Sequence, residues 1–415
     1  MQTNIGNAGT GQLASEGNSF QPVGPKGTGL TRGITSTSIT MGCVYTTADY
    51  AGYQAGIQAR FNQVNSSGGI FGRKLTLIPC KDDANSPQTN LQEVQQLVNQ
   101  NNVFGVISLT QNILPSSTNF LNSNQVPFYG WGFLPGFCNT RWGFGWNGCL
   151  TGNATTQAQQ PIAAIAGNLA EAIIKASGMP ASQVRLAVQS ENTTSGQVGA
   201  AQYAALFKQL GSQVVYNKSD FPATGSPDVT PYVQAMMASN PNIIYISTPF
   251  ANVGPMVAGL RAAGYKGISM DFTNYIPGLL PSSPQLAQAL QGEYVNTQIV
   301  PQEQNTPFIQ QIESALKAIG KQPFVTLGAE MGYIEAELLI EQLQATGQTL
   351  NTQTFDQKVN GAGFTTFASL QGGPGTLQWP AAHYLPADCA AIVKISGTNY
   401  QVVEPFSCYQ SFKVF

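Results

Sequence analysis

The chain has 415 residues, a formal net charge of −2 and a sequence pI near 5.5. This length is too great for one compact core and predicts two domains, and the charge excludes the basic surface of a nucleic-acid-binding protein. Charged residues make up only 9% of the sequence, far below the roughly 25% of an ordinary soluble domain. Such a surface is typical of a secreted protein.

The amino-terminal residues 1–31 are rich in Gly, Ser, Asn and Gln and predict a flexible tether. They lack the charged start and apolar stretch of a signal peptide. No run of about 18 apolar residues, long enough to span a membrane, occurs in the chain. We interpret the sequence as a mature secreted protein to which Met1 was added. A lipid anchor upstream is the one membrane attachment that we expect.

The first ordered stretch alternates strands and helices. Ser38–Tyr45 and residues 73–80 are predicted strands, with a helix at 52–64 between them. A further helix is expected after Pro87, which suits a first helical turn. Oxygens that could cap this helix are offered by Asp82, Asp83, Asn85 and Ser86. Strands and helices in this order, with short connections, predict a parallel sheet with right-handed crossovers.

The alternation continues along the chain and restarts after Thr151. Up to that point we expect helices at 90–100 and 115–122 and strands at 103–108 and 126–129. After it, the expected helices are 162–177, 197–210, 229–239 and 253–263, and the expected strands are 184–189, 213–216, 243–247 and 268–272. A strand at 293–299, helices at 308–319 and 328–345 and a β-rich tail at 364–415 complete the prediction.

Six cysteines, an even number, indicate disulfides. Two lie near the ends of neighbouring predicted strands, two enclose a short aromatic loop, and two flank strand-like runs at 390–395 and 400–406. The predicted pairs are Cys43–Cys80, Cys138–Cys149 and Cys389–Cys408. Free buried thiols are the alternative.

Residues 38–83 resemble a known family. The first strand, the loop at 51–56, Asn65, the run Gly68-Gly-Ile-Phe-Gly-Arg-Lys-Leu75 and the following Asp82-Asp83 pair are similar to the start of the type I periplasmic binding proteins. The closest likeness is to the leucine/isoleucine/valine-binding branch, the ligand-binding receptors of ABC transporters. Segments 228–246 and 260–267 extend the resemblance to about residues 33–298. The glycines of the run are expected to shape a turn rather than to contact ligand.

The resemblance implies an α/β fold of two doubly wound lobes, joined by a three-strand hinge, with a ligand cleft between them. It assigns residues 1–32 to the tether, 33–150 and 303–363 to the first lobe, and 151–302 and 364–415 to the second. It also implies an extracellular solute-binding protein of an ABC importer, on the outer face of the membrane or in the periplasm. Its partners would be a small organic ligand and the permease subunits. A ligand-sensing receptor domain of the same fold is the alternative.

Candidate ligand loops follow from the sheets alone, because ligands of open parallel sheets bind beyond the carboxyl ends of the strands. These loops are residues 46–52, 109–112, 130–134, 190–196, 248–252 and 271–275. Helix N-termini behind several of them supply free N–H groups for a carboxylate or another polar acceptor. Within the loops, the residues expected to bind ligand, most of them implied by the resemblance, are Tyr50, Thr110, Gln111, Asn112, Trp131, Gly132, Phe133, Ser195, Phe250 and Thr273.

Thr273 departs from the family pattern, because relatives place an acid there against the ligand's ammonium group. A cation in a partly dehydrated site needs a compensating anion. Unless Asp271, Glu191 or Asp49 supplies it, leucine, isoleucine and valine are expected to bind poorly.

The segment 130–150 holds six aromatic residues: Trp131, Phe133, Phe137, Trp142, Phe144 and Trp146. Trp131 and Phe133 favour a flat or apolar ligand, such as an aromatic or aliphatic carboxylate or an amino-acid-like molecule. The alternative, a structural cluster pinned by Cys138–Cys149, is what we expect for the other four.

No catalytic residue, metal site or cofactor is expected. The one histidine, His383, lies in a proline-containing loop without an evident nucleophile. Asp82 and Asp83 lack the spacing of a calcium loop, and zinc, phosphate-loop and nucleophile-elbow motifs are missing. A predicted helix carries four acids, at positions 330, 335, 337 and 341, on what we expect to be a solvated face.

Overall fold

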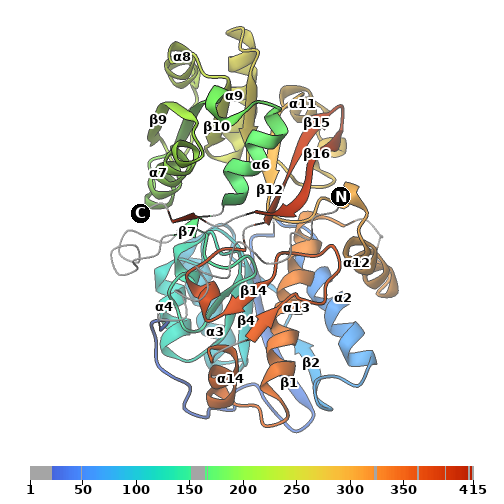
Figure 1. Ribbon diagram of the computed structural model, residues 1–415. Helices are drawn as coiled ribbons and strands as arrows, with labels where there is room; N and C mark the ends of the chain where they lie inside the picture. Colours follow the sequence, from blue (N-terminus) through green and yellow to red (C-terminus); the bar gives the residue numbers. More distant parts are fainter. Residues whose placement is uncertain are drawn as a thin grey trace, which may run out of the picture. The chain divides into compact units, whose positions relative to one another are not determined.

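The computed structural model describes residues 21–415 except 48, 151–163, 166, 322–324, 362–363, 388, 410–411 and 414–415. The chain divides into two compact units. The described parts of 11–163 and 306–387 form the first lobe, and those of 164–305 and 388–415 form the second. Each lobe packs helices beside a mainly parallel sheet (Figure 1). The chain passes between the lobes near residues 164, 306 and 388; the predicted three-strand hinge stays a prediction.

The first lobe is built on a six-stranded sheet of order β2-β1-β4-β5-β6, with β3 also paired to β1. Its pairings are parallel. The strands are β1 (Ser38–Tyr45), β2 (Lys74–Leu77), β3 (Lys81–Asp82), β4 (Gly105–Leu109), β5 (Phe128–Gly130) and β6 (Gly143–Gly145). Every residue of β4 is buried, as expected of a strand covered on both faces.

The helices of the first lobe are α2 (Tyr53–Ser66), α3 (Pro87–Asn99), α4 (Pro115–Ser123), α12 (Pro307–Ala318), α13 (Leu327–Thr346) and α14 (Thr352–Val359). Short 3₁₀ turns occur at η1 (Pro135–Phe137) and η4 (Ala381–His383), and β13 (Phe364–Thr366) pairs with β14 (Leu377–Trp379). Helix α3 begins as predicted, with Pro87 in the first turn and the Ser86 side chain accepting the Thr89 N–H.

The second lobe has a seven-stranded sheet of order β16-β15-β12-β11-β10-β8-β9, in which β15 pairs antiparallel with both β12 and β16 and the other neighbours pair parallel. Its strands are β8 (Arg185–Glu191), β9 (Gln213–Phe221), β10 (Ile243–Ser247), β11 (Ile268–Asp271), β12 (Tyr294–Thr297), β15 (Cys389–Ser396) and β16 (Asn399–Cys408). β7 (Ala164–Ile165) and β17 (Phe412–Lys413) form a separate pair. The helices are α6 (Gly167–Ser177), α7 (Thr194–Gln209), α8 (Thr230–Ala238), α9 (Phe250–Ala262), α10 (Leu279–Ser282) and α11 (Pro284–Ala289), with 3₁₀ turns η2 (Ala181–Gln183) and η3 (Gln302–Gln304).

The predicted lobe boundary at residue 364 is wrong, because 364–387 belong to the first lobe. The Phe367 N–H donates to Glu341 on α13 at 2.7 Å. The Trp379 ring packs edge-on against Phe144, with centroids 5.0 Å apart. These aromatic and backbone contacts hold β13 and β14 in the first lobe, and only the β15–β16 hairpin completes the second sheet.

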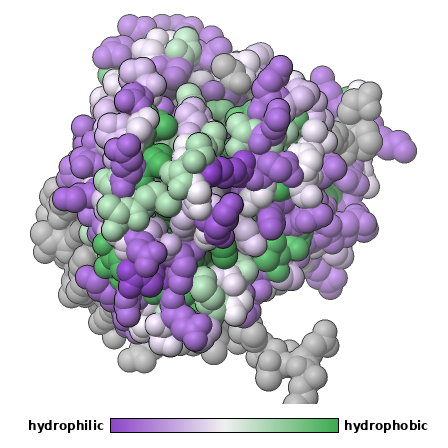
Figure 2. All heavy atoms as spheres, turned by 90° about the horizontal axis from the view of Figure 1, so that it is seen from above, coloured by the Kyte–Doolittle hydropathy of each residue, from purple (hydrophilic) through white to green (hydrophobic). Residues whose placement is uncertain are grey.

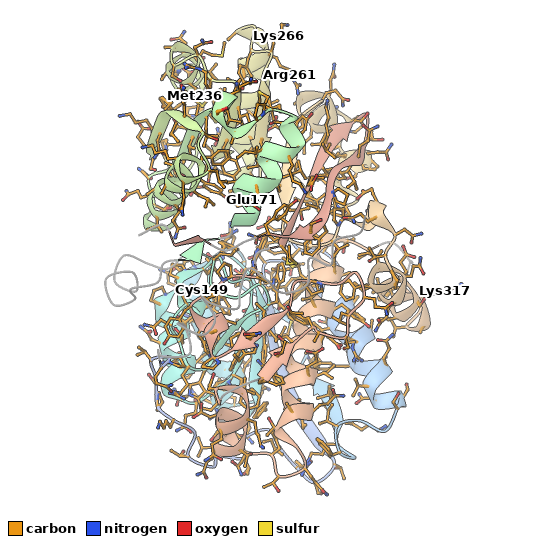
Figure 3. The ribbon with its side chains drawn as sticks, in the orientation of Figure 1. Cys149, Glu171, Met236, Arg261, Lys266 and Lys317 are labelled. Atoms are coloured by element: carbon orange, nitrogen blue, oxygen red, sulfur yellow. A yellow bond between two sulfur atoms is a disulfide. The ribbon has the colours of Figure 1, made fainter. Side chains whose placement is uncertain are left out.

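All six cysteines pair as predicted, as Cys43–Cys80, Cys138–Cys149 and Cys389–Cys408. Figure 3 marks Cys149, whose disulfide closes the aromatic segment of the first lobe.

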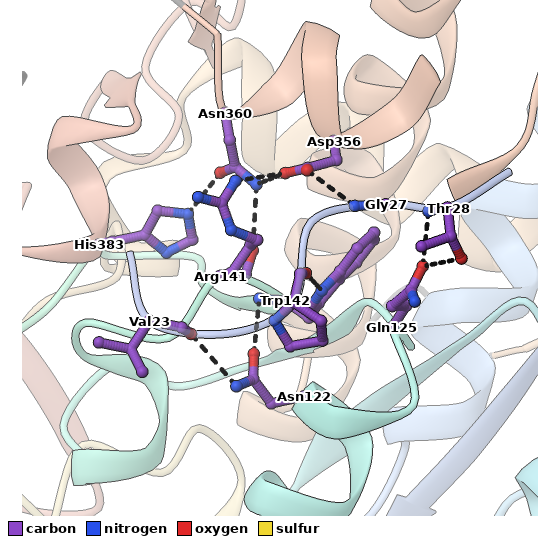
Figure 4. A network of polar contacts seen from close by, with 11 residues as sticks. Val23, Gly27, Thr28, Asn122, Gln125, Arg141, Trp142, Asp356, Asn360 and His383 are labelled. Carbon is purple, nitrogen blue, oxygen red and sulfur yellow. Dashed lines mark hydrogen bonds and ion pairs between the residues drawn. The ribbon is translucent and has the colours of Figure 1, made fainter. Parts of the chain in front are cut away.

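Residues 21–32 do not form the predicted tether; residues 1–20 lie outside the described part. This segment runs along the first lobe (Figure 4). Val23 forms an isolated parallel β-bridge with Thr140. The Trp142 indole N–H donates to the Pro25 carbonyl at 2.9 Å. A tether would lack such partners, so we name residues 21–32 the strap.

Helix α13 is enclosed and not solvated on its acidic face, which corrects that prediction. It packs beside α2 (Figure 1) and also contacts α14, β4 and β13. Glu330 and Glu335 are fully buried, and Glu337 is paired with Arg60. Tyr53 donates its hydroxyl proton to Glu335. The four glutamates therefore serve contacts inside the lobe rather than solubility.

Stability is expected to depend on pH through Glu341. Burial raises the pKa of this carboxyl from 4.5 to about 7, although the Phe367 N–H acts against the shift. The folded protein then holds a proton that the unfolded chain releases, so the free energy of unfolding falls as pH rises from 4.5 to about 7. The slope from one group is at most about 1.4 kcal/mol per pH unit.

Glu341→Gln should flatten this slope in urea titrations made at several pH values, whereas Glu313→Gln on α12 should leave it unchanged. Equal slopes for wild type and Glu341→Gln would contradict the assignment.

The face of the molecule drawn in Figure 2 is largely hydrophilic. In the face drawn in Figure 2, hydrophilic residues spread over much of the area, with hydrophobic ones scattered among them, although charged residues are only 9% of the chain. Uncharged polar side chains therefore supply most of the hydrophilic area of this face, as expected from the composition.

Candidate functional site

The carboxyl ends of three strands meet at one edge of the first-lobe sheet. Tyr45, the last residue of β1, is aligned with Asp82 of β3 and with Leu109 of β4. The next residues along each strand, Thr46, Asp83 and Thr110, therefore lie side by side. All three are buried.

Asp83 is the centre of a buried polar network at this edge. Its Oδ1 lies 2.8 Å from the Thr46 hydroxyl and 3.1 Å from the Asn85 N–H. Its Oδ2 accepts from the Thr110 hydroxyl, from the Asn112 side-chain amide at 3.3 Å and from the Asn90 side-chain amide at 3.2 Å. The carboxylate thus holds donors from three loops and from α3.

The helix-capping role predicted for Asp82 and Asp83 is wrong, because Ser86 alone caps α3. The exposed Asp82 instead accepts N–H groups from Thr47 at 3.2 Å and Ala84 at 2.9 Å. Sequence reasoning missed Asp83 as a site residue. The sequence did offer a signal for it, because Thr46, Asp83 and Thr110 each come directly after a strand of the same parallel sheet.

The Thr110 hydroxyl is fully engaged. It donates to Asp83 and accepts the Asn112 N–H at 2.9 Å, and Thr110 is only 4% exposed. It therefore has no proton left for a ligand. Gln111 is exposed, and its backbone N–H is bonded to none of the described residues, so this amide is the better donor.

Tyr50 lies in the loop after β1 and is 8% exposed. Burial raises the pKa of its hydroxyl to about 12, and a hydrogen bond with the Gln111 side chain acts against that shift. The Tyr50 hydroxyl therefore stays protonated at neutral pH.

Trp131 and Phe133 are half-buried in the loop after β5, with their rings edge to face and centroids 4.9 Å apart. Trp131 also lies 6.2 Å from Trp146. The remaining aromatics of this segment, Phe137, Trp142, Phe144 and Trp146, are at most 1% exposed. They form the structural cluster that the sequence predicted for them.

Gly132 has a packing role. Its N–H donates to the Asn147 side chain at 2.8 Å, so this amide is not available to a ligand. A Cβ at this position would lie 1.7 Å from the Gly148 carbonyl oxygen. Only glycine permits that approach, which brings Trp131 and Phe133 to their places.

The second-lobe candidates follow β8, β10 and β11. Ser195 lies in the first turn of α7, after the N-cap Thr193; its side chain is outside the described part. Phe250 is the first residue of α9 and is 39% exposed. Thr273 is half-buried after β11. All three thus follow the carboxyl ends of their strands, as predicted, but Ser195 and Phe250 lie in first helical turns and only Thr273 lies in a loop.

An acid lies directly beside Thr273. Asp271 Oδ1 accepts the Thr273 N–H at 2.6 Å and the Asn274 N–H at 2.8 Å. Its Oδ2 accepts no hydrogen bond from the described residues, and the side chain is fully buried. Burial raises the pKa of this carboxyl against those hydrogen bonds. The second lobe therefore places beside Thr273 one of the three acids that could substitute for the family's acid, and the binding strength of leucine, isoleucine and valine stays a prediction.

The six candidate loops contain acids and no bases. The first-lobe loops carry Asp49, and the second-lobe loops carry Glu191 and Asp271, without Lys, Arg or His. Burial raises the pKa of Asp49, with the charge of Asp83 as a second cause, and burial raises that of Glu191. Both sets of loops are therefore short of positive charge.

His383 is fully buried in the first lobe, where its Nε2 lies 2.7 Å from Asn360 Oδ1. Across the described ranges, no three His, Cys, Asp or Glu side chains are grouped to hold a metal ion. Within the same ranges, none of the helices has the length and apolarity to cross a membrane.

Comparison with solved structures shows the same fold. A solute-binding protein of an ABC transporter from Rhodopseudomonas palustris BisB5, in complex with 3,4-dihydroxybenzoic acid, has a TM-score of 0.61 and 15% identity over 91% of this chain and 98% of that chain. A branched-chain amino acid ABC transporter protein from Thermus thermophilus with bound valine has a TM-score of 0.68 and 13% identity over 91% and 98%. A fatty acid ABC transporter substrate-binding protein from Thermomonospora curvata has a TM-score of 0.68 and 17% identity over 94% and 95%.

No curated protein matches the sequence. A family model described as periplasmic binding protein matches residues 45–399, most of the chain. The two α/β lobes with parallel sheets agree with that match. Its members bind solutes and are not enzymes. The chain therefore belongs to the periplasmic binding protein family.

Proposed function

We propose that this protein is the extracellular solute-binding component of an ABC importer and delivers a small organic molecule to permease subunits. The observation that supports this most is the family match over 45–399, together with aromatic and polar side chains in the loops after the strands of each sheet. Such loops are where open parallel sheets bind ligands.

Capture would work by closure of the two lobes on the ligand. A ligand that contacts both lobes only in a closed state shifts the open–closed equilibrium by its differential affinity for the two states. The permease would then recognise the closed form. Dehydrated polar contacts make a misplaced ligand group costly, which gives selectivity.

The charge of the loops favours an amino-acid-like ligand over a simple carboxylate. An ammonium group suits the acids of these loops, Asp49, Glu191 and the buried Asp271, and the Gln111 N–H suits a carboxylate. Trp131 offers an aromatic face for an apolar or aromatic side chain. A ligand with only negative charge would meet Asp49, Glu191 and Asp271 without a compensating base.

A thermal-shift screen tests this proposal. Amino acids, aromatic acids, amides and polyols should be compared at equal concentration, because a bound ligand stabilises the protein by RT ln(1 + [L]/Kd). We expect the largest rise in Tm from an amino acid with an apolar or aromatic side chain. A rise with aromatic acids alone would contradict the charge assignment, and no rise with any compound would contradict solute capture from these classes.

Trp131→Ala should weaken the best compound of that screen by roughly 1–3 kcal/mol, because stacked aromatic area is lost. Isothermal titration measures this directly. The chain has four tryptophans, and Trp142, Trp146 and Trp379 are at most 1% exposed. Ligand-induced changes in tryptophan fluorescence should therefore come mainly from Trp131 and vanish in the variant.

Phe71→Ala is the matched control, because Phe71 is 49% exposed but precedes β2, at the opposite end of the strands. It should leave the affinity unchanged. Unchanged affinity of Trp131→Ala would remove Trp131 from the site.

A further inference from the structure

Asp83 touches more of the loops at the first-lobe sheet edge than any residue that the sequence assigned to ligand. We propose that Asp83 is a positioning residue, which holds the loops 46–50 and 110–114 in the one arrangement that a ligand meets. This inference rests on the proposed function for its purpose, but the arrangement itself is visible without ligand.

The network reaches both loops directly. Thr46 begins the first loop and donates to Asp83, and it also lies 3.1 Å from the Thr110 hydroxyl. Thr110 begins the second loop, and the Asn112 amide adds contacts to Asp83 and, at 3.1 Å, to Asn85 Oδ1. Neither loop can shift without breaking bonds to the same carboxylate.

The network also joins the loops to the helices behind them. The Asn90 side-chain amide of α3 donates to Asp83 at 3.2 Å, and its Oδ1 accepts the Ser117 hydroxyl of α4 at 2.7 Å. Asn90 and Ser117 are fully buried. These hydrogen bonds therefore fix the loops relative to α3 and α4, which are packed in the lobe, rather than to solvent-exposed chain.

A carboxylate is the group this site requires. Thr46, Asn85, Asn90, Thr110 and Asn112 all point donors at Asp83, and an ionised carboxylate is acceptor-only with about four lone-pair sites. An amide would turn one of the two oxygens into a donor. Either Thr46 and Asn85 or the other three donors would then face an N–H group.

Asp83 affects ligand binding by fixing the direction in which the Thr110 hydroxyl proton points. Because that proton points to Asp83, Thr110 presents none to the loop exterior, and the Gln111 N–H becomes the donor at this edge. Asp83 thereby determines which donors of the loop a ligand can bind, although Asp83 is itself fully buried and does not contact the ligand.

Asp356 provides the control for a purely structural role. It is a buried carboxylate of the same lobe, 5% exposed, and it accepts from Arg141, Asn360 and the Gly27 N–H. None of these partners lies in loops 46–50 or 110–114. Asp356→Asn should lower stability without loosening those loops, and Asp83→Asn should do both.

Hydrogen–deuterium exchange of the full chain, read by mass spectrometry well below Tm, tests the inference without any ligand. In Asp83→Asn, peptides covering 46–50 and 110–114 should exchange at least tenfold faster than in wild type, whereas peptides of α13 should be unchanged. If Asp83→Asn does not fold, Thr46→Val should show the same local effect, and Thr46→Ser should restore protection. Unchanged exchange in both loops, or an equal rise in Asp356→Asn, would overturn the proposal.

A binding arm separates this inference from the proposed function. With L-valine and 4-hydroxybenzoate as probes, any probe that wild type binds should bind Asp83→Asn at least tenfold more weakly and Asp356→Asn equally well. Equal affinity of Asp83→Asn would overturn the positioning role. Failure of wild type to bind any compound of the thermal-shift screen would count against the proposed function, while the exchange result would still decide the role of Asp83.

Discussion

Asp356→Asn is expected to lower the free energy of unfolding by about 3–5 kcal/mol, because it leaves a buried guanidinium without its anion. Arg141 and Asp356 are each 5% exposed, and Arg141 Nη1 lies 2.8 Å from Asp356 Oδ1 (Figure 4). Asn360 donates to the same oxygen at 2.8 Å. Chemical denaturation with urea, monitored by circular dichroism, gives the change.

The loss should extend to the strap, because the Gly27 N–H donates to Asp356 Oδ2 at 3.0 Å. Burial, and next the charge of Arg141, lowers the pKa of the nearby His383 to about 3, so this ring stays neutral and does not repel Arg141 near neutral pH. Limited proteolysis should cut the strap sooner in Asp356→Asn than in wild type.

Two further variants check the cause. Asp228→Asn replaces an exposed carboxylate of the second lobe that accepts the Thr230 N–H, and because asparagine keeps an acceptor oxygen the change should lower stability far less than Asp356→Asn. Arg141→Met combined with Asp356→Leu removes both charges and should cost less than the sum of the single changes. A loss below 1 kcal/mol for Asp356→Asn would show that the ion pair is not needed.

Gly332→Ala is expected to destabilise the protein by about 1–3 kcal/mol, although alanine favours helix by about 1 kcal/mol over glycine. A Cβ on Gly332 of α13 would lie 2.3 Å from the Tyr53 carbonyl oxygen of α2. Gly56 makes the reciprocal approach, because its Cβ would lie 2.0 Å from the Ala329 carbonyl oxygen. The two helices therefore meet backbone to backbone, and an added methyl group must separate them.

Gly199→Ala is the matched control. Gly199 also lies inside a helix, α7, but a Cβ there would meet nothing within 4 Å. This change should stabilise the protein by up to about 1 kcal/mol. Thermal unfolding of both variants separates helix propensity from packing, and a Gly332→Ala variant as stable as Gly199→Ala would show that α2 and α13 are not in tight contact.

Local sequence signals predicted much of the fold. The strand at Ser38–Tyr45 agrees with β1, and the cap at Ser86 and the proline at 87 set the start of α3. The disulfide pairs followed from placing cysteines at the ends of neighbouring strands. Helix α14, which carries Asp356, was not predicted; it is short and begins with a capping box at Asn351, a local signal that was overlooked.

The site could be predicted only to the level of loops. Parallel strands end at one edge, so the loops after them were candidates from the sequence alone. Which atoms remain free was not predictable: Thr110 was expected to bind ligand, but its hydroxyl proton is donated to Asp83. The Gly132 N–H is likewise bonded to Asn147, and a contact of Gly132 with ligand stays a prediction.

The sequence by itself determined where most strands and helices lie, how the cysteines pair and which family pattern the chain follows, because these depend mainly on local residue patterns and on periodic burial. The tertiary structure alone decided that Glu330, Glu335 and Glu337 of α13 are buried, that residues 364–387 join the first lobe and that the strap is anchored. The physical reason is distance along the chain. Asp356 is hydrogen-bonded to Gly27, 329 residues away in the sequence, and Glu335 to Tyr53, 282 residues away. The burial and hydrogen bonding of each carboxyl therefore depend on partners that a local sequence pattern does not predict.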